Sequence, residues 1–353
     1  MSRRGSALLL ASVLLVGLVV GADFLPVPYV TLQPGPLYDT LGQFRADPTG
    51  PARPVISISG ARTYPTTGRL ALTTVLVDGG PTQQPTLLQA IRAWLDRRWA
   101  VLPEPEFYPP NESQQAATQA TVQQMEDSQQ HALTAALHQL GLPIRPEVSV
   151  GQVTAGTPAA GRLRSGDVIL AVDGRPVATE AALRAAITAR RAGATVRLTI
   201  RRDGQVSVLT VGTVAGPGGR PVVGFMLVAG FVSSVRVTFG ISANDIGGPS
   251  AGLMLALGIV DELTPGGLTG GRFIAGTGTI DDTGAVGPIG GITQKVFAAA
   301  AAGATVFLAP ADECADAKAA APASLRVVRV STLAGAVAAL EALRAGHGAV
   351  PAC

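Results

Sequence analysis

Lysine is almost absent from this chain of 353 residues. Lysine and arginine together number 27, yet only Lys295 and Lys318 are lysines. Arginine stays protonated in proteins, whereas a buried lysine can lose its proton. A lysine retained in so arginine-rich a sequence is therefore a candidate general base.

Other scarcities argue against whole classes of function. Only 14% of the residues are charged, the net charge is +3, and no basic stripe with interleaved aromatic residues occurs, so nucleic acid is not an expected partner. No Gly-x-x-x-x-Gly-Lys-Ser/Thr segment is present, so we expect no nucleotide either. The two cysteines, Cys314 and Cys353, have no histidine beside them in the sequence, which argues against a cysteine protease. We expect neither a metal nor a cofactor.

Two segments carry candidate chemistry. The first, 247–252 (Gly-Gly-Pro-Ser-Ala-Gly), presents Ser250 on a tight turn before an apolar run. Pro249 suits the first position of a helix, which predicts that Ser250 lies in the first helical turn, where unpaired N–H groups favour developing negative charge. The second segment, 290–295, ends at Lys295, in the first turn of another predicted helix among apolar residues. Burial and the positive helix end both lower the pKa of a lysine, as a base acting on Ser250 requires.

Two simpler explanations compete with this pair. Residues 248–252 also fit the loose Gly-x-Ser-x-Gly turn of α/β-hydrolases, which needs an aspartate and a histidine downstream. The only later histidine, His347, lies in a glycine-rich tail. Alternatively, Ser250 caps a helix and Lys295 is an ordinary solvated lysine.

In order and spacing, the two segments resemble the Ser–Lys dyad of the Lon-type serine protease domain. The stretches 275–280, 286–291 and 302–310 are also similar to that family. From roughly residue 28 to 345, the chain resembles bacterial membrane-anchored, PDZ-containing Lon-like proteases that lack an ATPase module. The resemblance implies Ser250 as nucleophile, Lys295 as base and Thr277 as the residue whose hydroxyl orients the lysine amine. Many Lon proteases carry an aspartate where this chain has Gly247.

Residues 146–213 resemble a PDZ domain, chiefly through the run Gly-Asp-Val-Ile-Leu-Ala-Val-Asp-Gly at 166–174. PDZ domains bind an extended peptide at a sheet edge and hold its terminal carboxylate with backbone N–H groups. We assign that loop to 140–144, so Gly141 and Leu142, together with Gly248, are the predicted substrate-binding residues. The alternative is that this domain is only a structural spacer.

The predicted fold is α+β, with the PDZ domain inserted into a discontinuous Lon-type protease domain. A strand over 68–77 and a helix containing Ser128, both similar to parts of Lon domains, precede the PDZ segment, whereas Ser250 follows it. The predicted parts are therefore 1–28, 29–145, 146–213, 214–346 and a tail at 347–353. Strands over 222–228 and 232–241 are expected to resume the protease fold.

The N-terminal part, 1–28, predicts a single transmembrane helix. Arg3 and Arg4 precede an uncharged run over 5–22, long enough to cross a hydrocarbon core of about 30 Å. Basic residues on the N-terminal side place the rest of the chain outside the cytoplasm. The alternative is a cleaved signal peptide with a small-residue site near 20–22. In that compartment Cys314 and Cys353 either form a disulfide or remain unpaired thiols.

These expectations combine into a predicted ATP-independent serine endopeptidase of the cell membrane. It would cleave protein or peptide substrates on the extracytoplasmic face through an acyl-enzyme, and the PDZ domain would recruit or gate them. Lon-type domains usually form rings, so the resemblance also allows a homo-oligomer. The alternative function is that of a catalytically inactive, membrane-tethered PDZ adaptor that binds protein C-termini.

Overall fold

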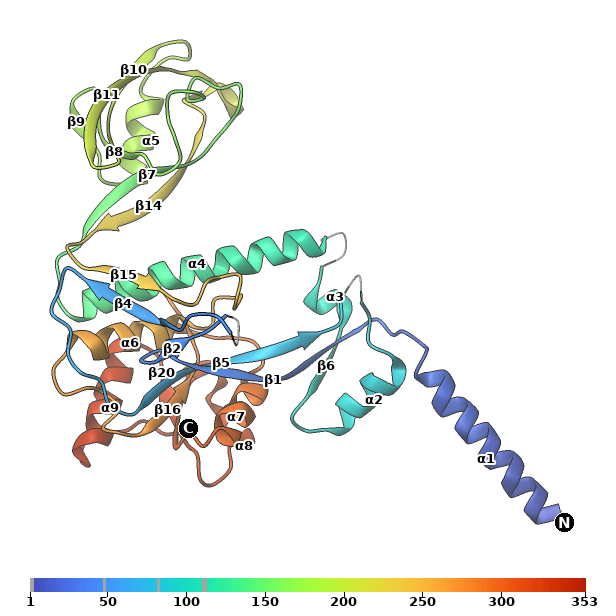
Figure 1. Ribbon diagram of the computed structural model, residues 1–353. Coiled ribbons are helices and arrows are strands. Elements are labelled where there is room, and N and C mark those ends of the chain that lie inside the picture. The colour runs from blue at the N-terminus through green and yellow to red at the C-terminus, as the bar shows by residue number, and fades with distance from the viewer. Residues whose placement is uncertain (1–2, 47–48, 81–82, 110–112) are drawn as a thin grey trace. The chain divides into compact units, whose positions relative to one another are not determined.

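The computed structural model describes the chain except for residues 1–2, 47–48, 81–82 and 110–112 (Figure 1). It divides into two compact units. One combines Met1–Gly141 with Val235–Cys353, and the other is the continuous segment Leu142–Ser234. The first unit is thus assembled from two stretches of sequence on either side of the second unit.

A six-stranded sheet joins the two stretches of the first unit, in the order β20-β19-β16-β5-β1-β6. Its strands are β1 (Tyr29–Asp39), β5 (Arg69–Asp78), β6 (Ala100–Pro103), β16 (Phe273–Gly276), β19 (Val306–Pro310) and β20 (Arg326–Val330). Strand β5 pairs antiparallel with β1 along most of its length, but it pairs in parallel with β16 only from Arg69 to Leu72. Neither stretch of sequence contains the whole sheet.

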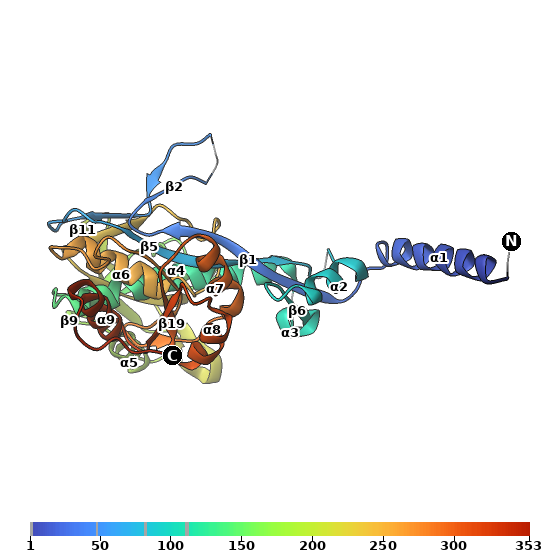
Figure 2. The same ribbon diagram turned by 90° about the horizontal axis from the view of Figure 1, so that it is seen from below.

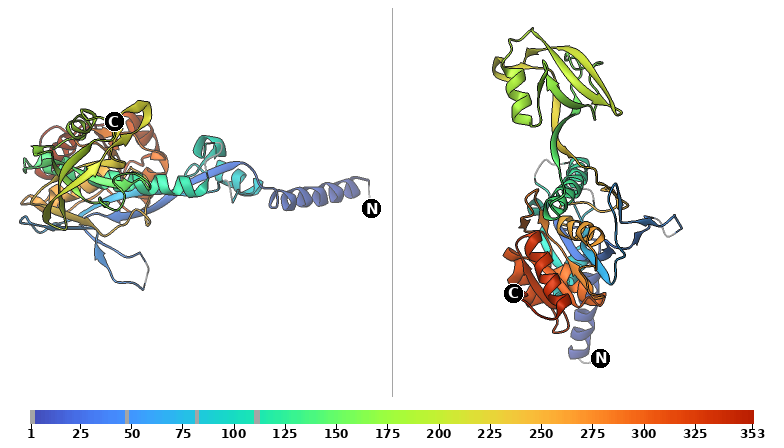
Figure 3. Two further views of the ribbon diagram at one scale, coloured as in Figure 1. Left: turned by 90° about the horizontal axis from the view of Figure 1, so that it is seen from above. Right: turned by 90° about the vertical axis from the view of Figure 1, so that its left-hand side faces the viewer.

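Helices cover both faces of this sheet (Figure 2). Helices α7 (Ile292–Ala301) and α8 (Cys314–Ala320) contact one face, and α6 (Gly252–Leu263) and α9 (Leu333–Ala345) contact the other. Side chains of β19 alternate accordingly, because Phe307 joins the core under α7 and α8, whereas Leu308 lies near Met254 of α6. The long helix α4 (Gln114–Gln139) runs against α6 (Figure 3). Consequently β19 is wholly buried, and β20 is buried at Val327, Val328 and Val330.

Shorter elements complete the first unit. They are α1 (Arg3–Ala22), β2 (Gln43–Phe44), β3 (Arg53–Pro54), β4 (Ile56–Ser59), α2 (Leu87–Leu95), α3 (Glu104–Phe107), β15 (Arg236–Phe239), β17 (Thr279–Ile280), β18 (Val286–Gly287) and the 3-10 helix η2 (Ala311–Glu313). Strand β1 carries a bulge between Pro34 and Leu37, where Gly35 lies against Thr74 too closely for any Cβ.

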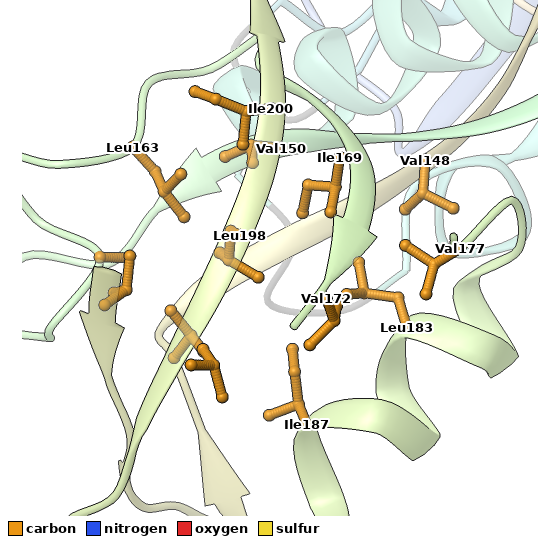
Figure 4. Close-up of a cluster of buried hydrophobic side chains, with 14 residues drawn as sticks. Val148, Val150, Leu163, Ile169, Val172, Val177, Leu183, Ile187, Leu198 and Ile200 are labelled. Atoms are coloured by element: carbon orange, nitrogen blue, oxygen red, sulfur yellow. The ribbon is translucent and has the colours of Figure 1, made fainter. Parts of the chain in front are cut away.

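The second unit is a sheet in the order β11-β10-β8-β7-β14 with helix α5 (Glu180–Thr188) packed on it. Its strands are β7 (Arg145–Val153), β8 (Val168–Val172), β9 (Arg175–Pro176), β10 (Thr195–Arg202), β11 (Gln205–Gly212), β12 (Val214–Ala215), β13 (Pro221–Val222) and β14 (Phe225–Val232), with the 3-10 helix η1 (Pro217–Gly219). Leu183 and Ile187 of α5 point into its own apolar core (Figure 4). This unit therefore has the core it needs to fold by itself.

One expected strand belongs to the other unit. The segment 222–228 was expected to resume the protease fold, but β14 instead forms a long antiparallel ladder with β7. The prediction was wrong because an apolar strand pattern says nothing about which sheet will accept the strand. Strand β15, from the second expected segment, does lie in the first unit, paired with β4.

Residues of the predicted membrane segment form α1. Within the described part of the chain, however, no helix combines the length and the apolarity needed to cross a bilayer.

The two cysteines form a disulfide, Cys314–Cys353, with their Cα atoms 5.2 Å apart. It ties the C-terminal residues to the start of α8, and Arg329 of β20 also donates its backbone N–H to Pro351. Of the two alternatives left open by the sequence, the structure contains the paired form.

We expect the two units to differ when expressed as fragments. Residues 142–234 should unfold cooperatively on heating, because their sheet and core are complete. Residues 235–353 should not, because they lack β1, β5, β6 and α4, against which α6 and β16 are buried. Circular dichroism melting of the two fragments beside the full chain tests this, and a cooperative transition in 235–353 would contradict it.

Candidate active site

Ser250 lies on a turn that α4 holds from outside. Gly248 donates its backbone N–H to the carbonyl of Thr121 at 3.0 Å, and the Ser128 hydroxyl donates to the carbonyl of Pro249 at 3.0 Å. Gly248 has a φ of 88°, in the region that favours glycine. The turn is thereby fixed on two successive residues just before the serine.

The serine precedes its helix, which corrects the prediction that it lies in the first turn. Helix α6 begins at Gly252, Ala251 is its N-cap, and that cap makes no side-chain hydrogen bond. At the start of α6 the backbone packs closely, since a Cβ at Gly252 would lie 2.8 Å from Ile280 and 2.9 Å from Ser128. Ser250 is therefore not a helix-capping side chain, and this alternative fails.

The carbonyl of Ser250 is held by the loop that follows β16. It accepts the backbone N–H of Gly278 at 3.0 Å and the hydroxyl of Thr277 at 3.0 Å. Thr277 is completely buried. The serine backbone is thus hydrogen-bonded to the central sheet as well as to α4.

Lys295 reaches the same threonine from the opposite helical layer. It lies in the first turn of α7, as predicted, and donates its backbone N–H to Gly291, the left-handed N-cap. Its side chain is only 2% exposed, and Nζ donates to Thr277 Oγ1 at 3.1 Å. A solvated surface lysine, the other simple alternative, is excluded by this burial.

Burial lowers the pKa of Lys295 from its ordinary 10.5 to about 8, while the carboxylate of Glu313 acts in the opposite direction. Such a shift amounts to about 3 kcal/mol against the charged form. The neutral amine is therefore far more populated near neutral pH than it would be at the ordinary value. The lysine can therefore accept a proton near neutral pH.

Ser250 and Lys295 both line one cavity of about 190 Å³. Its wall is formed by β1 and β5, by α4 and by the turn before Ser250; the lining includes Tyr38, Thr73, Val75, Met125, Asp245 and Ala251. Gly248 does not line it, and because its N–H is already bonded to Thr121 it has no donor to offer a substrate. These contacts assign Gly248 to shaping the turn, and its role in substrate binding stays a prediction.

Glycine at 247, where many Lon-type domains carry aspartate, also has a steric explanation. A Cβ there would lie 3.0 Å from the Cβ of Thr121 in α4. Glycine in place of aspartate at 247 thus accompanies close packing of this turn on α4.

Sequence reasoning missed the role of Glu313. This residue ends η2, and its carboxylate accepts the backbone N–H of Ile289 at 3.0 Å, in the glycine-rich loop just before α7. It also influences the pKa of Lys295. Nothing local in the sequence links residue 313 to residue 295, because the contact depends on how β19 returns beside α7.

A second cavity, of about 590 Å³, lies in the second unit between α5 and the start of β14. Its lining includes Arg184, Ile187, Val223, Gly224 and Phe225. Neither Gly141 nor Leu142, the predicted peptide-binding residues, lines it. The segment 223–225 has the character that we assigned to 140–144, a glycine between apolar residues leading into an edge strand. It escaped notice because it follows the PDZ-like core in sequence.

Comparisons with known families agree with this two-part organisation. Residues 122–213 match the PDZ domain model, and residues 233–339 match the model of the Lon protease C-terminal proteolytic domain. The chain thus contains a PDZ domain and a Lon-type C-terminal proteolytic domain.

Individual relatives match over single-domain lengths. The magnetosome formation protease MamE of Paramagnetospirillum magneticum is 46% identical over 82 residues, covering 23% of this chain and 11% of MamE. Its counterpart from Magnetospirillum gryphiswaldense is 43% identical over 93 residues, covering 25% and 12%. The chain thus spans about a tenth of these relatives.

Solved PDZ domains of SdrC-like proteins also match part of the chain. Those from Listeria monocytogenes and Listeria innocua are each 26% identical, with a TM-score of 0.22. Each covers 23% of this chain, and the matches span 86% and 92% of the two solved chains.

Two substitutions of Thr277 distinguish the contribution of its hydroxyl to stability from that of its side-chain volume. Thr277→Val keeps the volume but leaves the carbonyl of Ser250 and the Lys295 amine each without one partner, so we expect unfolding to become easier by about 1–3 kcal/mol. Thr277→Ser keeps the hydroxyl and should lose less. Chemical denaturation of both variants beside the wild type measures this, and equal stability of Thr277→Val and wild type would contradict the role assigned to the hydroxyl.

Proposed function

We propose that this protein is an ATP-independent serine endopeptidase in which Ser250 is the nucleophile and Lys295 the general base. The observation that supports it most is the buried Lys295 amine, bonded to Thr277 and lining one cavity with Ser250. A lysine held in this way keeps a fixed position at the wall of the cavity. Activation by an adjacent base is what a serine hydroxyl needs to become nucleophilic.

In the proposed reaction Lys295 first accepts a proton and then returns it, both when the acyl-enzyme forms and when it is hydrolysed. The Ser250 hydroxyl oxygen bonds to the substrate carbonyl carbon as its proton passes to the neutral Lys295 amine. The carbon–nitrogen bond of the substrate then breaks, and the lysine returns the proton to the leaving amine. Water, deprotonated by the same lysine, then attacks the acyl carbonyl carbon; the ester bond to Ser250 breaks, and the lysine returns the proton to the Ser250 oxygen. Thr277 keeps the amine aligned by accepting one of its hydrogens and donating its own to the carbonyl of Ser250.

Stabilisation of the oxyanion would come from backbone N–H groups next to Ser250. Within the described part of the chain, the N–H groups of Ser250 and Ala251 donate no hydrogen bond. They adjoin the positive end of α6. Pro249 has no N–H, and that of Gly248 is bonded to Thr121, so Ser250 and Ala251 are the proposed donors.

The cavity suits an extended peptide. Beyond Leu72, β5 leaves its pairing with β16, and the residues from Leu72 to Leu76 form the cavity wall. A strand edge without a partner offers backbone groups to an incoming chain. We therefore propose that substrate lies along this part of β5, with its scissile bond at Ser250.

The disulfide supports an extracytoplasmic location for the protease. Disulfides persist in oxidising compartments and are rare in the cytosol, and Cys314–Cys353 joins the chain close to Glu313 and the lysine loop. The proposed substrates are accordingly exported or membrane proteins.

Peptide recruitment by the second unit is a second candidate function. The cavity beside α5 borders β14, an edge strand of its sheet, and glycine at 224 has a φ of 98° at the entrance of that strand. Backbone N–H groups in such a turn can hold a terminal carboxylate. If Ser250 were inert, this groove would remain as the functional part of an adaptor.

The decisive experiment is active-site labelling with a fluorophosphonate, mapped by mass spectrometry. We expect an adduct on Ser250 that is absent in Ser250→Ala. It should also be lost in Lys295→Arg, because arginine keeps a positive charge but cannot act as a neutral base. Lys318→Arg, which alters the only other lysine, should label like the wild type. A folded wild-type chain that takes no label would favour the adaptor.

The pH dependence of labelling tests the role of Lys295 as base. Only the neutral amine accepts a proton, so the labelling rate should rise as pH increases through about 8 and then level off. The Glu313 carboxylate raises the lysine pKa, so Glu313→Gln, which retains an acceptor for Ile289, should move this midpoint to lower pH. Glu341→Gln, at an exposed position of α9, serves as the control. A midpoint that stays fixed or rises in Glu313→Gln would contradict this assignment.

A further inference from the structure

Helix α2 presents its large apolar side chains outward. Its buried residues are Ala90 and Ala93, whereas Ile91, Trp94 and Leu95 are 42%, 77% and 70% exposed. Positions 91, 94 and 95 lie on one helical face. Helices of soluble domains normally bury such residues and expose smaller or polar ones. The outward face of α2 is therefore suited to something other than the core of its own unit.

The adjoining segment extends this apolar surface. Phe24 and Leu25 are 78% and 54% exposed, and the carbonyl of Leu25 accepts the N–H of Leu87 at the start of α2. We call these five residues, Phe24, Leu25, Ile91, Trp94 and Leu95, the α2 patch. Single exposed apolar residues are common on soluble proteins, whereas several on one helical face and on the segment bonded to its start indicate an interaction surface.

The charges around the α2 patch indicate the kind of partner. Arg92 and Arg97 are exposed beside it, and Arg98 is paired with Asp96 at 2.7 Å. From 87 to 99 the chain carries three arginines and one aspartate, a net charge of +2 by 3 − 1, although Asp23 precedes Phe24. Both tryptophans of the protein, Trp94 and Trp99, lie in this short stretch. Apolar and aromatic residues bordered by arginine are typical of helices lying at a lipid–water interface.

The neighbouring helix favours lipid over a protein partner. Exposed apolar side chains continue along α1 from Leu9 to Val20, and α1 contacts α2 (Figure 2). A protein partner would have to cover this whole length, whereas a bilayer surface accommodates it without specific complementarity.

We propose that α2 lies flat on a phospholipid bilayer, with Ile91, Trp94 and Leu95 at the acyl-chain boundary and Arg92 and Arg97 among anionic headgroups. The surface would hold the first unit close to the membrane, independently of the chemistry at Ser250. This contact would restrict the accessible substrates to chains near the bilayer.

Tryptophan fluorescence tests the proposal, because Trp99→Phe leaves Trp94 as the only tryptophan. The full-length Trp99→Phe chain is mixed with phosphatidylcholine vesicles, with and without phosphatidylglycerol. We expect a blue shift of the Trp94 emission, quenching by lipids brominated on their acyl chains, and a larger effect with the anionic lipid that salt weakens.

Matched variants distinguish lipid contact through the α2 patch from nonspecific adsorption through other exposed apolar residues. Ile91→Ser with Leu95→Ser should raise the lipid concentration that gives half of the Trp94 shift by at least about tenfold. Val206→Ser with Val208→Ser, which removes two similarly exposed residues of β11, should leave it unchanged. Circular dichroism checks that every variant is folded.

Two results would overturn the proposal. One is a chain that sediments with vesicles while the Trp94 emission remains that of a water-exposed residue. The other is a blue shift that appears without vesicles as protein concentration rises, which would assign the patch to contact between copies of this chain.

Discussion

The site depends on one buried hydrogen bond, from Lys295 Nζ to Thr277 Oγ1. An ammonium group in so dry a position is costly, so the fold lowers its pKa and gives it a fixed neutral partner. Thr277 accepts from the lysine while it donates its own hydrogen to the carbonyl of Ser250. The two candidate catalytic segments are thus connected through one threonine on the end of a sheet strand.

Each residue of this group comes from a different layer of the first unit. The serine turn is fixed by α4, the threonine follows the central strand β16, and the lysine belongs to α7 on the other face. Since α4 precedes the PDZ-like unit and the other two follow it, the site requires both segments of the discontinuous unit. Insertion of the second unit is compatible with this because its own core is separate.

The second unit and the α2 patch suggest how a small protease domain could acquire substrates without an ATPase. The groove beside α5 offers an edge strand to a peptide, and the outward apolar face of α2 offers a surface to lipid. Under the two proposals, the groove would select substrates by their peptide sequence and the α2 patch by their position at the membrane.

The sequence by itself determined the local features. The scarcity of lysine singled out Lys295, the helix predicted around that lysine is α7, the strand predicted over 68–77 is β5, and the helix predicted around Ser128 is α4. Such features are encoded within one or two helical turns or strands, so composition and spacing reveal them. Tertiary structure decided what no local pattern contains: the start of α6 after Ser250, the contact of Glu313 with the lysine loop, the pairing of β14 with β7, and the outward face of α2. Each depends on which distant part of the chain packs against the segment, and this is determined only by the tertiary structure.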